Sequence, residues 1–216
     1  MTTPIIQVLI ADDHSILREG LKQILSETED ILVVAEAQTA AEAISLARTT
    51  NANIMLLDIS LPDRNGIEAL KIIKKDNPQL AVLMLSMHKE DQYAIRSLKA
   101  GASGYVSKQS ASSELVLAIR TVAKGKKYLS AGVAEALANQ IGVDTEKALH
   151  ETLSDREFQT LSMIASGLSV GDIALKLCLS VKTVSVYRAR LLEKMQLRNN
   201  AELTHYAIKN HLVEEE

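Results

Sequence analysis

The N-terminal half of the chain alternates short apolar runs with longer stretches whose apolar residues recur at helical spacing. The runs predict strands at residues 5–11, 31–35, 54–58, 81–86 and 105–107. The intervening stretches predict helices near residues 16–25, 39–48, 67–75, 91–99 and 110–124. Regular alternation of strand and helix is typical of a parallel sheet with helices on both faces. We therefore expect an α/β domain built on a five-stranded, doubly wound parallel sheet.

The C-terminal part has helical periodicity and no strand pattern. An Ala-rich segment predicts a helix at residues 129–140, and the polar residues 142–151 are interpreted as a linker. Four further helices are expected, near residues 154–167, 169–178, 180–195 and 201–210. The helices expected at 169–178 and 180–195 are separated only by a short turn near Leu179, and each begins with a serine. This pattern favours a helix-turn-helix. The expected domains are residues 1–126, a linker with a helix at 127–150, and an all-α domain at 151–216.

Several helix starts carry capping residues. Thr39-x-x-Glu42 and Ser154-x-x-Glu157 have the capping-box pattern, in which the first side chain and the acid each accept a backbone hydrogen bond. Ser110 is the expected cap of the helix that ends near Gly125. These signals support the helix boundaries independently of the apolar pattern.

Composition narrows the class of protein. With 216 residues the chain has room for two small domains, and with one Phe, no Trp and five Tyr its cores must be mainly aliphatic. No apolar run approaches the roughly 18 residues of a membrane span. The single cysteine, Cys178, cannot form an internal disulfide and is expected to be a small buried core residue. We expect a cytoplasmic protein without a membrane partner.

The net charge of −3 conceals a difference between the two parts of the chain. Residues 1–149 hold 16 Lys and Arg against 18 Asp and Glu, which gives −2. Residues 150–213 hold 8 against 6, which gives +2, and the final three glutamates add −3. A mildly basic C-terminal part is compatible with nucleic acid but does not establish it.

Polar side chains stand where the predicted strands end. Asp12 and Asp13 follow the first strand, Asp58 ends the third, Ser86 ends the fourth and Lys108 follows the fifth. The carboxyl ends of parallel strands meet at one edge of the sheet, where ligands of such folds bind. The simpler interpretation is that Asp58 only caps the turn after it, but that would not explain the polar groups at the other strand ends.

Carboxylates crowded together require a cation, and hard oxygen ligands suit Mg²⁺. The expected ligands are Asp13, Asp58 and the backbone carbonyl of Ser60, with Asp12 acting through a water molecule. Asp58 could then attack phosphorus as a nucleophile, while Lys108 and the Ser86 hydroxyl contact phosphoryl oxygens. His14 is expected to face solvent, because Mg²⁺ prefers oxygen ligands.

The set of Asp12-Asp13, Asp58, Ser86, Tyr105 and Lys108 resembles the receiver domain of two-component response regulators over residues 5–125. Leu153-Ser154-Asp155-Arg156-Glu157, Thr183-Val184 and Ala201-Glu202-Leu203 resemble a LuxR-type helix-turn-helix. Together they resemble the NarL/FixJ class of transcriptional response regulators. The resemblance implies a flavodoxin-like receiver, phosphorylation of Asp58 by a sensor histidine kinase, and a switch formed by Ser86 and Tyr105. It further implies a homodimer of the phosphorylated form, RNA polymerase as a further partner, and docking of the C-terminal domain on the receiver in the inactive form.

The helix expected at 180–195 would contact DNA. Side chains suited to phosphates are Lys182, Thr183, Arg188, Arg190 and Lys194. Side chains that could contact base edges are Ser185, Val186 and Ala189. LuxR-type domains often have Lys at the Ser185 position and Asn-Lys at the Val170-Gly171 position, so binding should depend on dimerisation, Arg188 and Lys194. The last helix, at 201–210, could cover the core or form a dimer interface.

Three other functions compete with this interpretation. Phosphatases with an aspartate nucleophile have a second acid two residues further on, where this chain has Ser60. A receiver that only dimerises, without phosphate chemistry, would not need the complete acidic set. A helical bundle used only for protein contacts is the alternative for the C-terminal domain. We expect a DNA-binding regulator and not an enzyme.

Overall fold

The computed structural model describes residues 5–87, 91–108, 112–141, 148–210 and 212–213. The chain divides into two compact units, Met1–Gln140 and Ile141–Glu216. The first holds all the strands described and the second is helical, as the sequence predicts. Among the described residues, no helix is both long and apolar enough to cross a membrane.

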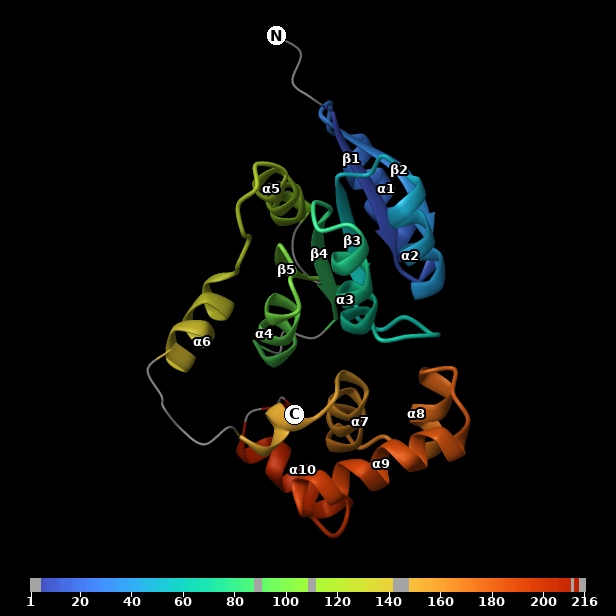
Figure 1. The fold of residues 1–216 in the computed structure, drawn as a ribbon, viewed down its shortest axis with the longest axis vertical. Helices are drawn as coiled ribbons and strands as arrows, with labels where there is room; N and C mark the ends of the chain where they lie inside the picture. Colours follow the sequence, from blue (N-terminus) through green and yellow to red (C-terminus); the bar gives the residue numbers. More distant parts are fainter. Residues whose placement is uncertain (1–4, 88–90, 109–111, 142–147, 211, 214–216) are drawn as a thin grey trace. The chain divides into compact units, whose positions relative to one another are not determined.

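The N-terminal unit is an α/β domain with a five-stranded parallel sheet in the order β2-β1-β3-β4-β5 (Figure 1). Its strands are β1 Ile6–Ala11, β2 Ile31–Ala37, β3 Ile54–Asp58, β4 Ala81–Ser86 and β5 Gly104–Ser107. Its helices are α1 Ser15–Ser26, α2 Ala40–Thr49, α3 Gly66–Asp76, α4 Asp91–Lys99, α5 Ser112–Ala123 and α6 Ala131–Ile141. The predicted fold class is confirmed, and most predicted boundaries agree with the structure within two residues.

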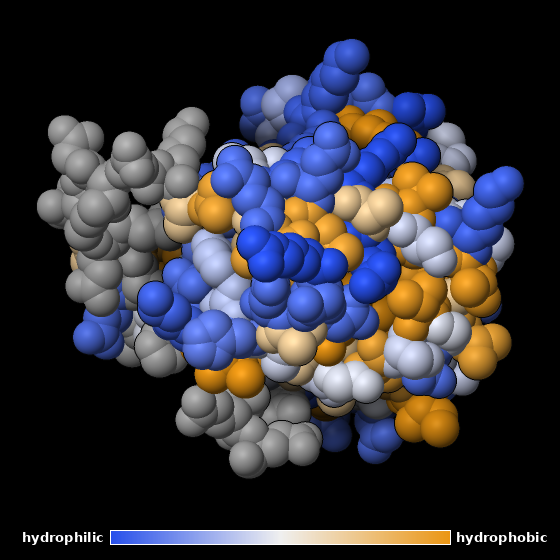
Figure 2. Space-filling view, turned by 90° about the horizontal axis from the view of Figure 1, so that it is seen from below, coloured by the Kyte–Doolittle hydropathy of each residue, from blue (hydrophilic) through white to orange (hydrophobic). Residues whose placement is uncertain are grey.

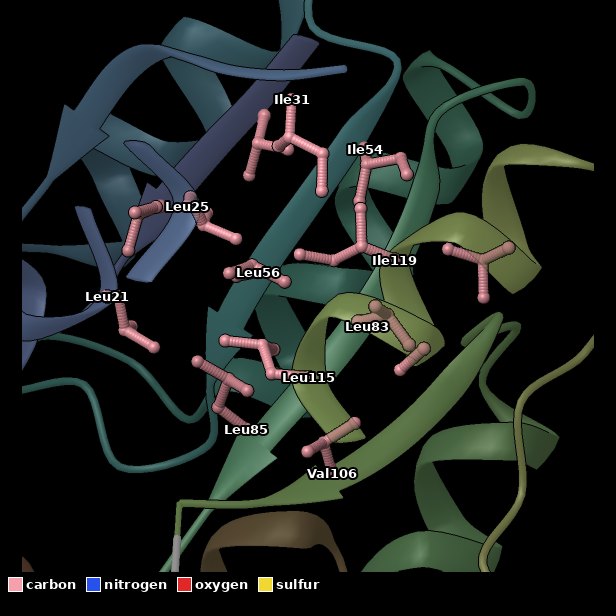
Figure 3. Close-up of a cluster of buried hydrophobic side chains, with 14 residues drawn as sticks. Leu21, Leu25, Ile31, Ile54, Leu56, Leu83, Leu85, Val106, Leu115 and Ile119 are labelled. Carbon is pink, nitrogen blue, oxygen red and sulfur yellow. The ribbon is translucent and has the colours of Figure 1, made fainter. Parts of the chain in front are cut away.

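Strand alternation gives the sheet two different apolar faces. Ile54, Leu56 and their neighbours on the adjacent strands pack against Leu25 of α1 and Ile119 of α5 (Figure 3). The residues of opposite parity, such as Met55, are equally buried, and α2, α3 and α4 contact the sheet. Strands buried on both faces explain why their sequences are continuously apolar rather than alternating.

The capping signal at Thr39 is half confirmed. The Thr39 hydroxyl accepts a hydrogen bond from the Glu42 amide at 3.1 Å, as predicted. The Glu42 carboxylate, however, accepts from the Gln38 amide at 2.7 Å and not from Thr39, so this is not a reciprocal box. Ser110, the expected cap of α5, lies outside the described residues.

The chain after α5 is fastened to the sheet before α6 begins. Tyr128 forms an isolated parallel bridge with Gly104, and its amide donates to the Ser103 carbonyl at 3.0 Å. A Cβ at Gly104 would lie 2.6 Å from the Tyr128 carbonyl oxygen, so only glycine permits this approach. The phenol of Tyr128 donates to Glu114 of α5 at 2.9 Å. The segment leading toward the C-terminal unit is therefore bound to β5 and α5.

The C-terminal unit contains a short 3-10 helix and four α-helices. They are η1 Leu149–Thr152, α7 Asp155–Ala165, α8 Val170–Lys176, α9 Val181–Met195 and α10 Asn200–Lys209. The box at Ser154 is reciprocal, as predicted, and Ser169 and Asp172 form a second one. Buried side chains from all four α-helices, including Phe158, Ile173, Leu191 and Leu203, make the core.

The expectation that Cys178 is buried is wrong. Cys178 is exposed and has φ 51°, a left-handed conformation that ends α8. Its amide donates to the Leu175 carbonyl at 3.2 Å, and the Leu179 amide donates to the Ala174 carbonyl at 2.9 Å, as in a Schellman turn. Helical periodicity does not continue through such a turn, so the Cys178 side chain points out of the core.

Candidate functional site

Asp12, Asp58 and Lys108 converge at the carboxyl edge of the sheet. Asp12 follows β1, Asp58 is the last residue of β3, and Lys108 follows β5. Asp58 has the parity of Leu56 and Ile54, so its side chain continues the face covered by α1 and α5. The prediction that these groups share one edge of the sheet is confirmed.

Lys108 bridges the two buried carboxylates. Its Nζ lies 2.6 Å from Asp12 Oδ2 and 2.8 Å from Asp58 Oδ2. The side chain of Asp58 is 2% exposed and that of Lys108 is 3% exposed. Asp13 lies close to these two carboxylates, so three carboxylates and one ammonium share the site, which leaves an excess of two negative charges.

Burial dominates the electrostatics of Asp58. It raises the pKa of the Asp58 carboxyl above its ordinary value; Lys108 lowers that pKa, Asp12 raises it, and the Ser60 amide, which donates a hydrogen bond, lowers it. Burial would lower the pKa of Lys108, but the attraction of Asp58 and Asp12 outweighs it, so the pKa of Lys108 is raised. The surroundings therefore favour the charged form of Lys108, while burial makes the charged form of Asp58 costly in free energy.

The turn after β3 holds Asp58 in place through backbone contacts. The Ile59 amide donates to Leu85 of β4 at 3.1 Å, and the Gly66 amide donates to the Ile59 carbonyl at 2.8 Å. A Cβ at Gly66 would lie 2.0 Å from the Asp58 carbonyl oxygen. The buried side chain of Asn65 caps α3 by accepting from the Ile67 amide at 2.8 Å. Asn65-Gly66 therefore makes both the close turn and the start of α3.

Asp63 is a functional anchor that the sequence did not reveal. Its two carboxylate oxygens accept from the amides of Ala40 and Ala41 at 2.8 and 2.9 Å. The loop after Asp58 is thereby tied to the N-terminus of α2, where a negative charge is favourable. The partners are 22 and 23 residues apart, so no local pattern could have indicated the contact.

The carboxylates fit a divalent metal ion. Ligand atoms of Asp12, Asp13, His14 and Asp58 all lie within 4.8 Å of one another. The set offers mainly carboxylate oxygen, which suits a hard cation. The His14 side chain is 63% exposed, as expected for a solvent-facing residue, although its Nδ1 lies 2.8 Å from Asp13. The structure thus shows an acidic cluster consistent with a metal site.

Ser86 and Tyr105 lie on the opposite face of the sheet from Asp58. Ser86 pairs with Ser107 and Met84 with Tyr105, so Ser86 and Tyr105 have the same parity. Both side chains are buried, and the Lys108 amide donates to the Ser86 carbonyl at 2.7 Å. A backbone hydrogen bond thus links Ser86 directly to Lys108. The switching role of Ser86 and Tyr105 stays a prediction.

A second candidate site is α9. Predicted DNA-contacting side chains that are exposed are Lys182, Ser185, Val186, Ala189, Arg190 and Lys194. Thr183 and Arg188 are partly buried. Exposed apolar residues of the helix-turn-helix include Leu175, Val181 and Val186. Hydrophobic and hydrophilic side chains are interspersed on the face of the molecule that Figure 2 shows.

Two of the predicted phosphate-binding side chains already have partners within the C-terminal unit. Lys194 Nζ lies 2.7 Å from the buried carboxylate of Glu157 on α7. Arg188 Nε donates to Asn200 Oδ1 at 2.6 Å. These contacts pack α9 against α7 and α10, so both residues have a structural role whether or not they contact DNA.

Family models match both units of the chain. Residues 8–120 match the response regulator receiver domain, and residues 151–207 match the bacterial regulatory proteins of the LuxR family. The chain therefore belongs to the two-component response regulators with a LuxR-type DNA-binding domain, a family of transcription regulators and not of enzymes.

Particular relatives match along almost the entire chain. Response regulator UvrY of Escherichia coli is 37% identical over 208 residues, 96% of this chain and 95% of UvrY. Response regulator GacA of Pseudomonas aeruginosa is 34% identical over 210 residues, 97% of this chain and 98% of GacA. A structure of the RcsB response regulator of Salmonella typhimurium is 30% identical with a TM-score of 0.60, covering 94% of this chain and 98% of its own. A structure of an RcsB–DNA complex has the same identity and TM-score and covers 94% of this chain and 97% of its own.

Proposed function

We propose that Asp58 is the phosphoacceptor of this response regulator and that its phosphorylation controls DNA binding by α9. The observation that supports this proposal best is the Lys108 ammonium, 2.8 Å from Asp58 and 2.6 Å from Asp12 in a buried acidic site. An ammonium there can pair with a phosphoryl oxygen once phosphate arrives. The phosphodonor would be a sensor histidine kinase.

The transfer forms one bond and breaks one. A carboxylate oxygen of Asp58 attacks phosphorus, and the bond from phosphorus to the donor breaks with its electron pair leaving on the donor. The product is an acyl phosphate on Asp58. Lys108 neutralises one phosphoryl oxygen, and positioning with charge neutralisation is most of what this reaction requires of a protein.

Mg²⁺ is the proposed cofactor. Asp13, Asp58 and the Ser60 carbonyl would hold it, with Asp12 acting through water, and it would neutralise the incoming phosphate. The excess of negative charge over the single ammonium supports this assignment.

The proposed switch joins Ser86 and Tyr105 to the phosphoryl group. Ser86 is the last residue of β4, so its hydroxyl can move to the carboxyl edge of the sheet and donate to a phosphoryl oxygen. Tyr105 takes the space that Ser86 leaves, which changes the surface formed by α4, β5 and α5. The phosphorylated form dimerises and binds DNA, in line with a solved structure in which two RcsB dimers are bound to two parallel DNAs. It then acts in the cytoplasm on DNA, with RNA polymerase as a further partner.

We propose that residues 1–126 form the receiver domain, residues 127–150 the linker and residues 151–216 the DNA-binding domain. The matched segments 8–120 and 151–207 fall inside the outer two domains. The compact unit that ends at Gln140 includes most of α6, because the chain around Tyr128 is bound to β5. In our proposal α6 belongs to the linker by function although it packs with the receiver.

The test is to incubate the protein with Mg²⁺ and acetyl phosphate and then measure intact mass and DNA affinity. We expect one phosphate adduct in the wild type, none in Asp58→Asn, and tighter DNA binding only where the adduct forms. Asp76→Asn is the matched control, since Asp76 ends α3, pairs with Arg48 outside the acidic site, and should keep the adduct. An adduct that leaves DNA affinity unchanged would contradict the coupling. No adduct in the wild type would favour a receiver that only dimerises.

A further inference from the structure

A basic pocket lies at the opposite edge of the sheet from Asp58. It is formed where strands β1, β3, β4 and β5 begin and where α3 and α5 end, and its volume is about 560 Å³. Its basic side chains are Lys74, Arg120, Lys124, Lys126 and Lys127, and its carboxylate is Asp30. Five cations against one anion give the lining a charge of +4, in a chain whose net charge is −3.

The single carboxylate of this pocket is already neutralised. Arg120 binds both oxygens of Asp30, with Nε at 2.8 Å and a terminal nitrogen at 2.7 Å. This pairing lowers the pKa of Asp30 and raises that of Arg120. Within the described part of the chain, no carboxylate forms an ion pair with any of the four lysines. Asp30 and Arg120 thus form a closed pair, and among the described residues the four lysines have no carboxylate partner.

Two of these lysines are fixed by the backbone close to each other. Lys74 Nζ donates to the carbonyls of Pro78 and Leu80 at 2.9 and 2.8 Å, and Lys127 Nζ donates to the Ala102 carbonyl. Burial first, and then the charge of Lys127, lower the pKa of Lys74. Lys74 is partly buried and Lys127 is exposed, and the repulsion between two like charges destabilises the fold unless an anion binds between them.

Helix ends explain only part of this charge. Lys74 lies in the last turn of α3, where a cation interacts favourably with the helix dipole. Lys126 and Lys127 lie beyond the end of α5 at Ala123, in the segment bound to β5. Tertiary structure brings them to the pocket that Lys74 also lines, so the helix dipole does not explain their positions.

We propose that this pocket binds a small molecule bearing phosphate groups. Several ammonium groups around one cavity suit a multiply charged anion better than a single carboxylate. The apolar part of the lining, which includes Ile5, Ile6 and Val122, can receive an uncharged portion of the ligand. Since Lys127 adjoins Tyr128, the ligand would also hold the start of the linker against β5.

The test is calorimetric titration of the full chain with pyrophosphate in EDTA, where the acidic site lacks a metal ion and repels phosphate. We expect saturable binding that weakens at least tenfold in Lys127→Gln and is unchanged in Lys75→Gln, a neighbouring exposed lysine outside the pocket. Lys126→Gln is a second variant, because Lys126 makes no side-chain contact that the fold needs. Asp58→Asn should bind pyrophosphate like the wild type, which separates this pocket from the phosphorylation site.

Equal affinity in Lys127→Gln and Lys75→Gln, or no saturable binding at millimolar pyrophosphate, would overturn the proposal. A parallel titration with duplex DNA tests whether the pocket binds the phosphates of a nucleic acid backbone instead of those of a small molecule. If Lys127→Gln weakened only DNA binding and not pyrophosphate binding, the pocket would serve the nucleic acid backbone and the proposal would fail.

Discussion

Asp58 combines a reactive position with an unfavourable charge. Its carboxylate is buried beside Asp12, and Lys108 neutralises only part of the local negative charge. Burial raises the pKa of Asp58, so its ionised form reduces the stability of the fold. The reactivity toward phosphate that we propose for Asp58 and the cost of its charge have the same origin, because both follow from placing a carboxylate where water is excluded.

Asp58→Asn is therefore expected to stabilise the metal-free protein. Lys108 keeps Asp12 as its partner at 2.6 Å, so replacing the Asp58 charge by a neutral group of similar shape should raise the free energy of unfolding in EDTA by about 1 kcal/mol, the equivalent of a modest rise in the pKa of Asp58. Urea unfolding of wild type and variant measures the difference. Millimolar Mg²⁺ should reduce the difference, because it stabilises the wild type more. A variant less stable than the wild type in EDTA would contradict this account.

Gly66 is the second residue on which the site depends. Gly66→Ala places a Cβ 2.0 Å from the Asp58 carbonyl oxygen, so the turn must move. We expect a loss of roughly 3 kcal/mol or more, as for severe overpacking, together with slower phosphorylation. Gly20→Ala is the control, since nothing lies within 4 Å of its Cβ in α1, and it should gain about 0.5–1 kcal/mol. Equal stability of the two variants in thermal unfolding would show that the turn adapts.

Among the elements, α9 has a packing role in addition to the DNA-binding role that we propose for it. Val184, Leu191 and Met195 bury one side of it, and Lys194 pairs with Glu157 of α7. Burial raises the pKa of Glu157, but hydrogen bonds from Lys194 and Ser154 outweigh it, so the pKa is lowered. The charge pair at this helix contact therefore holds α9 against α7, and Lys194 is also one of the residues that we propose to contact DNA.

Two substitutions separate these roles. Glu157→Gln keeps a cap acceptor for Ser154 but frees Lys194, so stability should fall by about 0.5–1 kcal/mol with DNA affinity kept or raised. Lys194→Gln should lower both and reduce the slope of log affinity against log salt by about one. Salt-dependent DNA titrations and thermal unfolding measure the two effects. Equal losses of DNA affinity in both variants would assign Lys194 a structural role alone.

The contact of Tyr128 with β5 and α5 gives a pH dependence. Burial first, and then the hydrogen bond to Glu114, raise the pKa of Tyr128 from 10.0 to about 12. Because the folded pKa is the higher one, Tyr128 contributes stability that is fully present below pH 10 and is lost as pH rises through 12. Tyr128→Phe should therefore flatten the fall in stability over this range. Urea unfolding of the wild type and Tyr128→Phe at several alkaline pH values measures this effect. The same fall in stability in both proteins would contradict the raised pKa of Tyr128.

In the molecule as a whole, the proposed phosphorylation of Asp58 in the N-terminal unit must change DNA binding by the C-terminal unit. Asp58 and Lys108 lie on the α1 and α5 side of the sheet, whereas Ser86 and Tyr105 lie on the other side. The amide of Lys108 is bonded to the Ser86 carbonyl at 2.7 Å, and Tyr128 ties the linker to β5. A change at the phosphoryl group can thus reach β5, and β5 contacts the chain that leads to the DNA-binding unit.

Ser86→Ala tests this route. We expect the phosphate adduct to form as in the wild type, because Asp58 and Lys108 are intact. The increase in DNA affinity on phosphorylation should fall by roughly fivefold, the equivalent of one hydrogen bond of about 1 kcal/mol. Ser107→Ala, at the paired position on β5, is a matched control for removing a hydroxyl from this edge. An unchanged DNA affinity of phosphorylated Ser86→Ala would exclude the hydroxyl from the switch.

The elements and the strand-end position of Asp58 follow from the sequence alone. Apolar runs and helical patterns are local, and parallel strands bring their carboxyl ends to one edge, so the sequence places Asp12, Asp58 and Lys108 together. The family motifs then gave these positions their expected chemistry.

Tertiary structure decided which partners these side chains have. The anchoring of Asp63 at α2, the pairing of Lys194 with Glu157 and the outward turn of Cys178 depend on neighbours distant in the chain or on one left-handed residue. The lysine pocket arises in the same way, from segments that meet only when the sheet is formed. Periodicity reports which face of an element is buried; it carries no information on which charged groups meet across elements.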